Sequence, residues 1–270
     1  MTGPEPAVQA AERTGRLAIA DLTVSFGSGR VVSIAELGLG HAEILGLAGE
    51  SGSGKSMTTL AILGLAHTVG ATVAGSITLD GQELTVLSAE DLRRIRGRRI
   101  AAIFQSPSTA FSPVYRVGAV MTKALRLHGA ARSEAADRAA QAMRQVLLSP
   151  DLMRRYPSQL SGGQLQRVAI ALAVALRAEV LLADEPTSAL DVTVQAEVLD
   201  LLRELRETSG MSILFISHDL AVVAELCDRV AVMRHGLIVE QGPAGQVLSA
   251  PASPYTAELL DAVPKLAGRP

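Results

Sequence analysis

The sequence of 270 residues lacks several features that mark whole classes of protein. Its single cysteine, Cys227, excludes an internal disulfide and suits a reducing compartment. No uncharged run of 18 residues exists, because Arg177 and Glu179 interrupt the most apolar stretch at residues 168–183. The formal net charge of −2 offers no basic footprint for nucleic acid or an anionic membrane surface. We therefore expect a cytosolic globular chain that neither crosses a membrane by itself nor binds nucleic acid.

Lysine is almost as scarce, with three residues against 22 arginines, and one of the three is Lys55 in a glycine-rich segment. Residues 49–56 fit the pattern G-x-x-x-x-G-K-[ST], hereafter the phosphate loop. Glycines permit a close backbone approach, successive N–H groups cradle phosphate oxygens, and lysine brings a compact positive charge. The predicted nucleotide ligands are Gly49, Glu50, Ser51, Gly52, Ser53, Gly54, Lys55, Ser56 and Met57.

The flanking sequence gives this loop the required context. An apolar run at residues 44–48 predicts a buried strand before it, and residues 57–65 predict a helix after it. Such a helix would aim its positive end at the phosphates. A chance glycine-rich turn is therefore disfavoured.

Three further apolar runs also end at residues that can do chemistry. Residues 100–104 lead to Gln105, residues 180–183 to Asp184 and Glu185, and residues 213–217 to His218. Continuous apolar runs are typical of parallel strands buried on both faces. Open parallel sheets bind ligands beyond the carboxyl ends of their strands. The sequence therefore predicts that these side chains converge on the nucleotide.

Chemistry suggests the role of each side chain. Asp184 and the Ser56 hydroxyl are oxygen ligands suited to Mg²⁺, and the Gln105 carbonyl can touch Mg²⁺ or orient water. Glu185 can accept a proton from an attacking water. His218 can hydrogen-bond the terminal phosphate.

The remaining sequence predicts the domain organisation. Residues 1–16 are expected to form a mobile arm, and residues 17–39 an antiparallel hairpin. Residues 113–178 show helical patterns without a good strand, with Ser133 as a candidate helix cap. Strand and helix patterns alternate again from residue 179 onward, as in a parallel sheet.

One further segment points to a family. Together with Gln105, Asp184–Glu185, residues 188–191 and His218, the segment Leu160-Ser161-Gly162-Gly163-Gln164 resembles the nucleotide-binding subunits of ABC transporters. The resemblance spans about residues 17–260. It implies an α/β fold: a P-loop NTPase core with a mainly parallel sheet, an N-terminal antiparallel β subdomain and an inserted helical subdomain, within a nucleotide-binding domain at 17–250.

The resemblance also implies how the site is completed. ATP and Mg²⁺ are the expected cofactors, and two subunits face head to tail. The helix that opens within Leu160, Ser161, Gly162, Gly163 and Gln164 of one subunit meets the terminal phosphate held by the other, which suits an anion. Asp191 is expected to bridge the two sites, and Phe26 to stack on adenine.

Three stretches resemble the importer ATPases for dipeptides, oligopeptides and nickel in particular. They are residues 104–113, residues 187–195 and residues 253–260 within a tail at 251–270, with departures at Ser106, Phe111, Ser112 and Ser253. The implied function is ATP hydrolysis that drives import of a peptide, nickel or a metal chelate. The implied partners are a second ATP-binding subunit, identical or homologous, two integral membrane permease subunits and an extracytoplasmic substrate-binding protein. The implied location is the cytoplasmic face of the cell membrane.

Two alternatives stay open. An exporter subunit would share the same motor chemistry, because fold does not fix the direction of transport. A soluble ABC ATPase acting on nucleic acid or ribosomes is disfavoured, because Lys55 and Ser161 are separated by only 105 residues without a heptad array. The arginine cluster at residues 93–99 is interpreted as a solvated surface segment. The sequence does not name the cargo.

Overall fold

The computed structural model describes residues 15–106, 110–188 and 190–262, and the chain divides into two compact units. The first unit consists of Met1–Leu87 and Ser212–Pro270, and the second unit of Ser88–Met211. Most of the predicted arm (residues 1–14), part of the segment after Gln105 (107–109), Ala189 and the end of the tail (263–270) lie outside the described residues.

The first unit contains an antiparallel sheet in the order β2-β1-β4-β5. Its strands are β1 (Leu17–Phe26), β2 (Gly29–Leu39), β4 (Thr72–Leu79) and β5 (Gln82–Glu83). Alternate residues of β1 are buried, as expected for a sheet with one solvated face. Asp80 and Gly81 turn β4 into β5 with φ values of 47° and 78°, which a tight hairpin turn requires. The predicted hairpin at 17–39 is confirmed.

The second sheet segment of the first unit carries the phosphate loop. Strand β3 (Ile44–Ala48) pairs in parallel with both β8 (Ser212–Ser217) and β9 (Arg229–Arg234), and β10 (Leu237–Pro243) pairs antiparallel with β9. Every residue of β3 and β8 is buried, which explains their uninterrupted apolar sequences. The helices of this unit are α2 (Lys55–Ile62), η1 (Ala66–Val69), α9 (Leu220–Leu226), α10 (Ala244–Ser249) and α11 (Pro254–Asp261).

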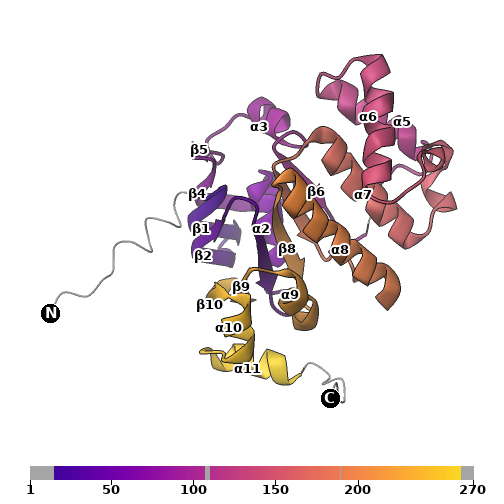
Figure 1. The fold of residues 1–270 in the computed structure, drawn as a ribbon. Helices are drawn as coiled ribbons and strands as arrows, with labels where there is room; N and C mark the ends of the chain where they lie inside the picture. The colour runs from indigo at the N-terminus through magenta and orange to yellow at the C-terminus, as the bar shows by residue number, and fades with distance from the viewer. Residues whose placement is uncertain (1–14, 107–109, 189, 263–270) are drawn as a thin grey trace, which may run out of the picture. The chain divides into compact units, whose positions relative to one another are not determined.

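The second unit is mainly helical. Its parallel strands are β6 (Ile100–Ile103) and β7 (Val180–Asp184). Helices α5 (Val117–Leu127), α6 (Arg132–Gln145) and α7 (Gly162–Leu176) lie side by side (Figure 1). The other helices are α3 (Ala89–Ile95), η2 (Pro150–Arg154), η3 (Pro157–Gln159) and α8 (Val192–Ser209). Among the described residues from 110 to 178 there is no strand, in agreement with the expected helical insertion.

One predicted helix cap is wrong. Helix α6 begins at Arg132, and its N-cap is Ala131, whose side chain makes no capping bond. The Ala135 N–H donates to the Ala131 carbonyl at 2.9 Å, so Ser133 lies inside the first turn. A side-chain cap contributes about 1 kcal/mol, which an earlier start with its added backbone bonds can offset.

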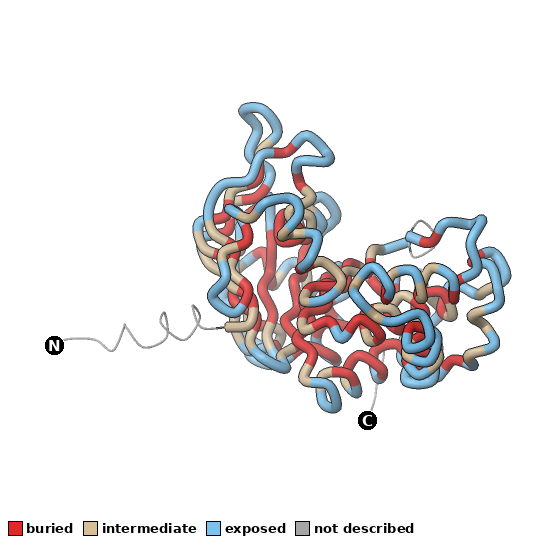
Figure 2. The backbone as a smooth tube through the Cα atoms, turned by 90° about the horizontal axis from the view of Figure 1, so that it is seen from above, coloured by how far each residue is buried: buried red, intermediate tan, exposed pale blue. Residues whose placement is uncertain are grey.

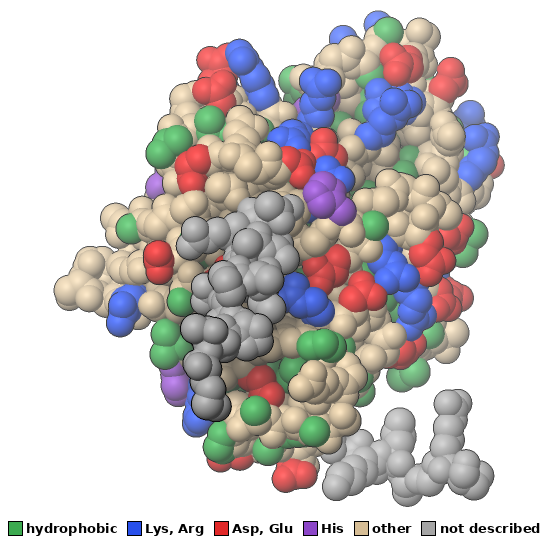
Figure 3. Space-filling model, turned by 60° about the vertical axis from the view of Figure 1, so that its left-hand side comes forward, with side chains coloured by type: hydrophobic (Ala, Val, Ile, Leu, Met, Phe, Trp, Pro, Cys, Tyr) green, Lys and Arg blue, Asp and Glu red, His purple; other side chains and the backbone are tan. Residues whose placement is uncertain are grey.

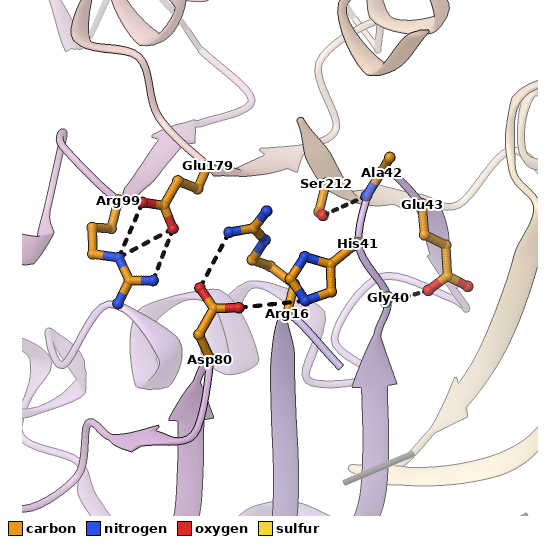
Figure 4. A network of polar contacts seen from close by, with 9 residues as sticks. All are labelled: Arg16, Gly40, His41, Ala42, Glu43, Asp80, Arg99, Glu179 and Ser212. Atoms are coloured by element: carbon orange, nitrogen blue, oxygen red, sulfur yellow. Dashed lines mark hydrogen bonds and ion pairs between the residues drawn. The ribbon is translucent and has the colours of Figure 1, made fainter. Parts of the chain in front are cut away.

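The charged side chains form local pairs. Buried residues run through the interior of each unit in Figure 2, while acidic and basic side chains are interspersed on the face drawn in Figure 3. Asp80 accepts from Arg16 at 3.1 Å and lies 3.5 Å from His41 (Figure 4). In the second unit Arg99, from the arginine cluster, forms a bidentate ion pair with Glu179. Its guanidinium nitrogens donate to the carboxylate oxygens at 2.8–3.3 Å (Figure 4).

A search of the described residues finds no helix with both the length and the apolar character that crossing a membrane requires.

Candidate functional site

The phosphate loop follows β3 without an intervening residue. Gly49, Gly52 and Gly54 adopt φ values of 149°, 81° and 111°, a region that side-chain-bearing residues rarely enter. A Cβ atom on Gly49 would lie 2.1 Å from the Met233 carbonyl oxygen of β9. The first glycine is therefore needed for both conformation and space.

Lys55 is the first residue of α2 and only 5% exposed. Its Nζ donates to the carbonyl oxygens of Gly49 and Glu50, both at 2.7 Å, and to Ser53 Oγ at 3.3 Å. The loop thus closes around its own ammonium group. A concavity with a fixed positive charge at a helix N-terminus can hold phosphate oxygens. Ser56 is exposed and Met57 is half-buried.

His218 and the loop leave the same edge of the sheet. Strands β3 and β8 are paired in parallel with Ala48 opposite Ser217, so the residue after each strand starts from the same level. The His218 side chain is exposed. At the end of β1, Phe26 is 40% exposed, which leaves its ring accessible.

The second unit brings together two of the predicted side chains. Strands β6 and β7 are parallel with Ile103 opposite Ala183, and Gln105 Nε2 donates to Glu185 Oε2 at 2.8 Å. Glu185 has a φ of 49°, unusual for a residue other than glycine and a conformation that is often found at functional sites. Asp184 is 5% exposed and is the last residue of β7, although the sequence predicted that the strand ends one residue earlier.

The segment Leu160–Gln164, hereafter the signature segment, forms the start of α7. Ser161 is the N-cap: its Oγ accepts from the Gln164 N–H at 3.2 Å, and its own N–H donates to Gln164 Oε1 at 3.1 Å. Ser161 and Gly162 are exposed, Gly163 is buried, and Leu160 is half-buried. The first N–H groups of a helix have no partner within the helix, so this end can bind an anion.

The start of α8 lies against the start of α7. Asp191 is the N-cap of α8 and accepts from the Val194 N–H at 3.0 Å. A Cβ atom on Gly163 would lie 2.3 Å from Val194 Cγ1. Asp191 therefore has a structural task as a cap, and its predicted bridging role remains a prediction.

The predicted metal ligands are hard oxygen donors: the Ser56 hydroxyl in the first unit, and the Asp184 carboxylate and the Gln105 carbonyl in the second. This donor set fits Mg²⁺, which uses few protein ligands and keeps waters and substrate phosphates in its shell. The Gln105 amide nitrogen faces Glu185, which identifies the opposite atom, the carbonyl oxygen, as the candidate ligand. Within the described residues, no cluster of three or more His, Cys, Asp or Glu side chains could hold a cation alone.

Comparison with known proteins assigns the family. The family described as ABC transporter matches residues 32–188. A putative peptide import ATP-binding protein of Brucella abortus is 44% identical over 258 residues, which cover 93% of this chain and 77% of the relative. CbiO1 of Clostridium perfringens, described as part of the transporter complex CbiONQ, matches with a TM-score of 0.77 at 25% identity, covering 88% of this chain and 92% of that chain. A dimeric ATP-binding cassette bound to ADP and Pi matches with a TM-score of 0.73 at 26% identity over 84% of this chain and 98% of that chain. This chain belongs to the ABC transporter family and is an ABC-type ATPase with a P-loop NTPase fold.

Two contacts were not predicted from the sequence. One is the hydrogen bond between Gln105 and Glu185. The other joins the phosphate loop to the C-terminal helix, where Glu50 N–H donates to the Tyr255 hydroxyl at 3.4 Å. The motif at residues 253–260 drew attention to Tyr255, but nothing in its spacing indicates which loop it contacts.

Proposed function

We propose that this chain binds ATP through the phosphate loop and hydrolyses it at a site that a second ATP-binding subunit completes. The observation that carries this proposal is the position of Lys55, buried and held by the loop that surrounds it. A fixed lysine and a row of backbone N–H groups neutralise phosphate charge, which is most of what phosphoryl transfer requires.

The residues of the second unit supply the chemistry at the attacking water. Glu185 accepts the proton of the water, and the Gln105 amide that donates to its Oε2 orients the carboxylate. Asp184, Ser56 and the Gln105 carbonyl would hold Mg²⁺, and the ion would supply positive charge to the phosphate oxygens. His218 donates a hydrogen bond to the terminal phosphate. Phe26 offers an exposed apolar face for adenine.

The second subunit contributes its signature segment. The capping box satisfies the N–H groups of Ser161 and Gln164, which leaves the first-turn N–H groups of Gly162 and Gly163 as the donors for the terminal phosphate. Asp191, at the start of the adjacent helix, communicates between the two sites. The dimeric, ADP- and Pi-bound neighbour supports this pairing.

The cargo is proposed to be a peptide. A relative that matches 93% of this chain is named a putative peptide import ATP-binding protein, which favours peptides over nickel or a metal chelate. Cargo passes through two separate permease subunits, and an extracytoplasmic protein delivers it. The chain sits at the cytoplasmic face of the membrane, with nucleotide-binding domain 17–250, helical subdomain 113–178 and importer-like tail 251–270. Export is the alternative, because the motor does not fix direction.

Replacing the proposed base tests the catalytic assignment. Glu185→Gln is expected to bind ATP normally, to lose about 10²–10⁴-fold in turnover and to accumulate as an ATP-bound dimer in light scattering. Glu207→Gln on α8, 63% exposed in its side chain, is the matched control and should hydrolyse ATP at the normal rate. Normal hydrolysis by Glu185→Gln would rule out Glu185 as the base.

A transport experiment tests the cargo. Host cells carrying either the native chain or Lys55→Ala are supplied in parallel with a labelled peptide and with ⁶³Ni²⁺. Loss of peptide uptake alone supports the proposal. Loss of nickel uptake alone, or export of preloaded peptide, contradicts it.

A further inference from the structure

Tyr255 of helix α11 contacts the phosphate loop. Tyr255 is the second residue of the helix and is only 4% exposed, although its side chain carries a hydroxyl group. Its hydroxyl oxygen accepts from the Glu50 N–H at 3.4 Å, across 205 positions of sequence. Both groups belong to the first unit.

This contact has a consequence for Lys55, because the Gly49 carbonyl and the Glu50 N–H belong to the same peptide group. A trans peptide is planar, and its C=O and N–H point in opposite directions. The carbonyl of this peptide accepts from Lys55 Nζ at 2.7 Å, while its N–H donates to Tyr255. Tyr255 and Lys55 therefore bind the same planar peptide group at its opposite edges, Tyr255 at the N–H and Lys55 at the C=O.

One contact holds the ring of Tyr255, and a second holds the segment just before its helix. The Arg234 guanidinium lies 4.4 Å from the centre of the tyrosine ring, within cation–π distance. Glu240 of β10 accepts the N–H groups of Ala252 at 2.7 Å and Ser253 at 3.1 Å, just before α11 begins. Burial alone would raise the pKa of Glu240, but hydrogen bonds from this segment lower it, so the carboxylate stays charged at neutral pH.

The turn between β9 and β10 holds the other side of the loop. The Gly236 N–H donates to the Ser53 carbonyl at 2.8 Å. Arg234, which stacks on Tyr255, is two residues earlier in the same chain segment. One structural block thus contacts the loop at both Glu50 and Ser53.

We propose that Tyr255 is a positioning residue for nucleotide binding, which acts by fixing the Gly49–Glu50 peptide and through it the Lys55 ammonium group. This inference rests on the proposed role of the phosphate loop in binding ATP. It assigns a task in the nucleotide site to the importer-like tail, whose sequence motif by itself indicates only a resemblance to importer ATPases.

The test removes one oxygen atom. Tyr255→Phe keeps the ring and its contact with Arg234 but loses the acceptor for Glu50. ATP binding is measured by calorimetry in EDTA, at a temperature where each variant is fully folded. Because a hydrogen bond contributes about 1 kcal/mol, the Kd for ATP is expected to rise roughly fivefold, with kcat at saturating ATP changed by less than twofold. Tyr156→Phe, whose ring lies 5.7 Å from Arg116 in the second unit, is the matched control with an unchanged Kd.

The outcomes separate this inference from the proposed function. If Lys55→Ala leaves the ATP Kd unchanged, the loop assignment itself fails. If Lys55→Ala weakens ATP binding but Tyr255→Phe does not, the inference is overturned, even if the variant melts at a lower temperature. Should Tyr255→Phe fail to fold, Glu240→Ala loosens the start of α11 while keeping the hydroxyl, and an unchanged Kd in that variant would also overturn the inference. In a double-mutant cycle, additive effects of Tyr255→Phe and Lys55→Ala would exclude action through Lys55.

Discussion

The phosphate loop and the signature segment are both glycine-rich helix starts, yet they differ in burial and in hydrogen bonding. In the loop Gly49, Ser53 and Lys55 are buried while Glu50, Ser51, Gly52 and Ser56 are exposed, and the buried lysine donates to carbonyls of the loop itself. In the signature segment Ser161 and Gly162 are exposed, and the side chains of Ser161 and Gln164 each accept from the backbone N–H of the other residue.

This difference in burial and hydrogen bonding shows which contacts determine the conformation of each segment. The loop takes its shape from contacts within the first unit, so it is preorganised for a ligand before one arrives. The signature segment has the shape of any capped helix, and its special feature is the accessible N-terminus that it offers. This agrees with a loop that acts within its own subunit and a segment that acts on another.

The largest difference between the two segments is expected when the buried charge of the phosphate loop is removed. Lys55→Ala is expected to lower ATP turnover by about 10²–10³-fold, since it removes the group that stabilises charge on the phosphates. Lys123→Ala, on exposed α5 surface, is the control. Steady-state hydrolysis at saturating ATP measures both. A loss of turnover below tenfold would mean that the backbone N–H groups of the loop supply most of the stabilisation of phosphate charge.

A matched pair of glycines tests whether the two segments differ in their fit. Gly49→Ala forces a Cβ to 2.1 Å from the Met233 carbonyl, whereas at Gly162 the nearest atom to an added Cβ is Leu190 Cδ2 at 3.8 Å. Gly49→Ala should lower the free energy of unfolding by about 3 kcal/mol. Gly162→Ala should leave it unchanged or raise it by up to about 1 kcal/mol, because alanine favours helix.

The same pair separates binding from turnover. Gly162→Ala should bind ATP normally in isolation but hydrolyse it more slowly at concentrations where dimers form, because the added methyl group crowds the donors. Urea denaturation and hydrolysis rates across protein concentration give both quantities. Equal destabilisation by the two substitutions would contradict the contrast.

Acid should weaken the two units in different pH ranges. In the second unit, burial and the nearby Arg98 charge lower the pKa of His128 below its usual 6.5, so the unfolded chain takes up the proton first. The contribution of His128 is therefore lost as pH falls below 6.5. In the first unit, burial would raise the pKa of Glu83, but hydrogen bonds from Ser76, Thr85 and backbone N–H groups lower it from 4.5 to about 2. Its contribution is present above pH 4.5 and is lost between pH 4.5 and 2.

Two substitutions assign these ranges. Relative to the native chain, His128→Gln should flatten the fall in stability that begins as the pH drops below 6.5, and Glu83→Gln should flatten the fall between pH 4.5 and about 2. Urea denaturation at several pH values provides the comparison. If both substitutions change stability in the same pH range, the two units are not destabilised by acid in separate pH ranges.

The smallest expected effect concerns the strand beneath the loop. A Cβ on Gly46 of β3 would lie 3.0 Å from Cys227 Sγ, so this thiol packs against the strand that carries the loop. Burial, and then the Asp228 charge, raise the pKa of the Cys227 thiol well above its usual range. Labelling by a thiol reagent should therefore be slow in the native state and should change little on adding ATP. Rapid labelling would mean that the packing of Cys227 against β3 opens readily in the native state.

The sequence predicted what depends on local pattern or on sheet geometry. The glycines of the phosphate loop have one demanding conformation, and the side chains at the ends of neighbouring parallel strands start from a shared edge, so Gln105 and Glu185 could be expected near each other. Which atoms meet depends on rotamers, and their hydrogen bond could not be read in advance. The contact of Tyr255 with Glu50 joins segments 205 positions apart, beyond any local pattern. Ser133 was misplaced because a good capping residue is only a weak influence beside extra backbone bonds.

The self-contained lysine of the phosphate loop also bears on how a nucleotide is bound and released. Three acceptors of the loop hold the Lys55 ammonium group at one position. A nucleotide therefore meets a charge that is already in place, and binding does not have to order that side chain. When the product leaves, the same acceptors still satisfy the ammonium group, so the site returns to its starting state without a buried unpaired charge.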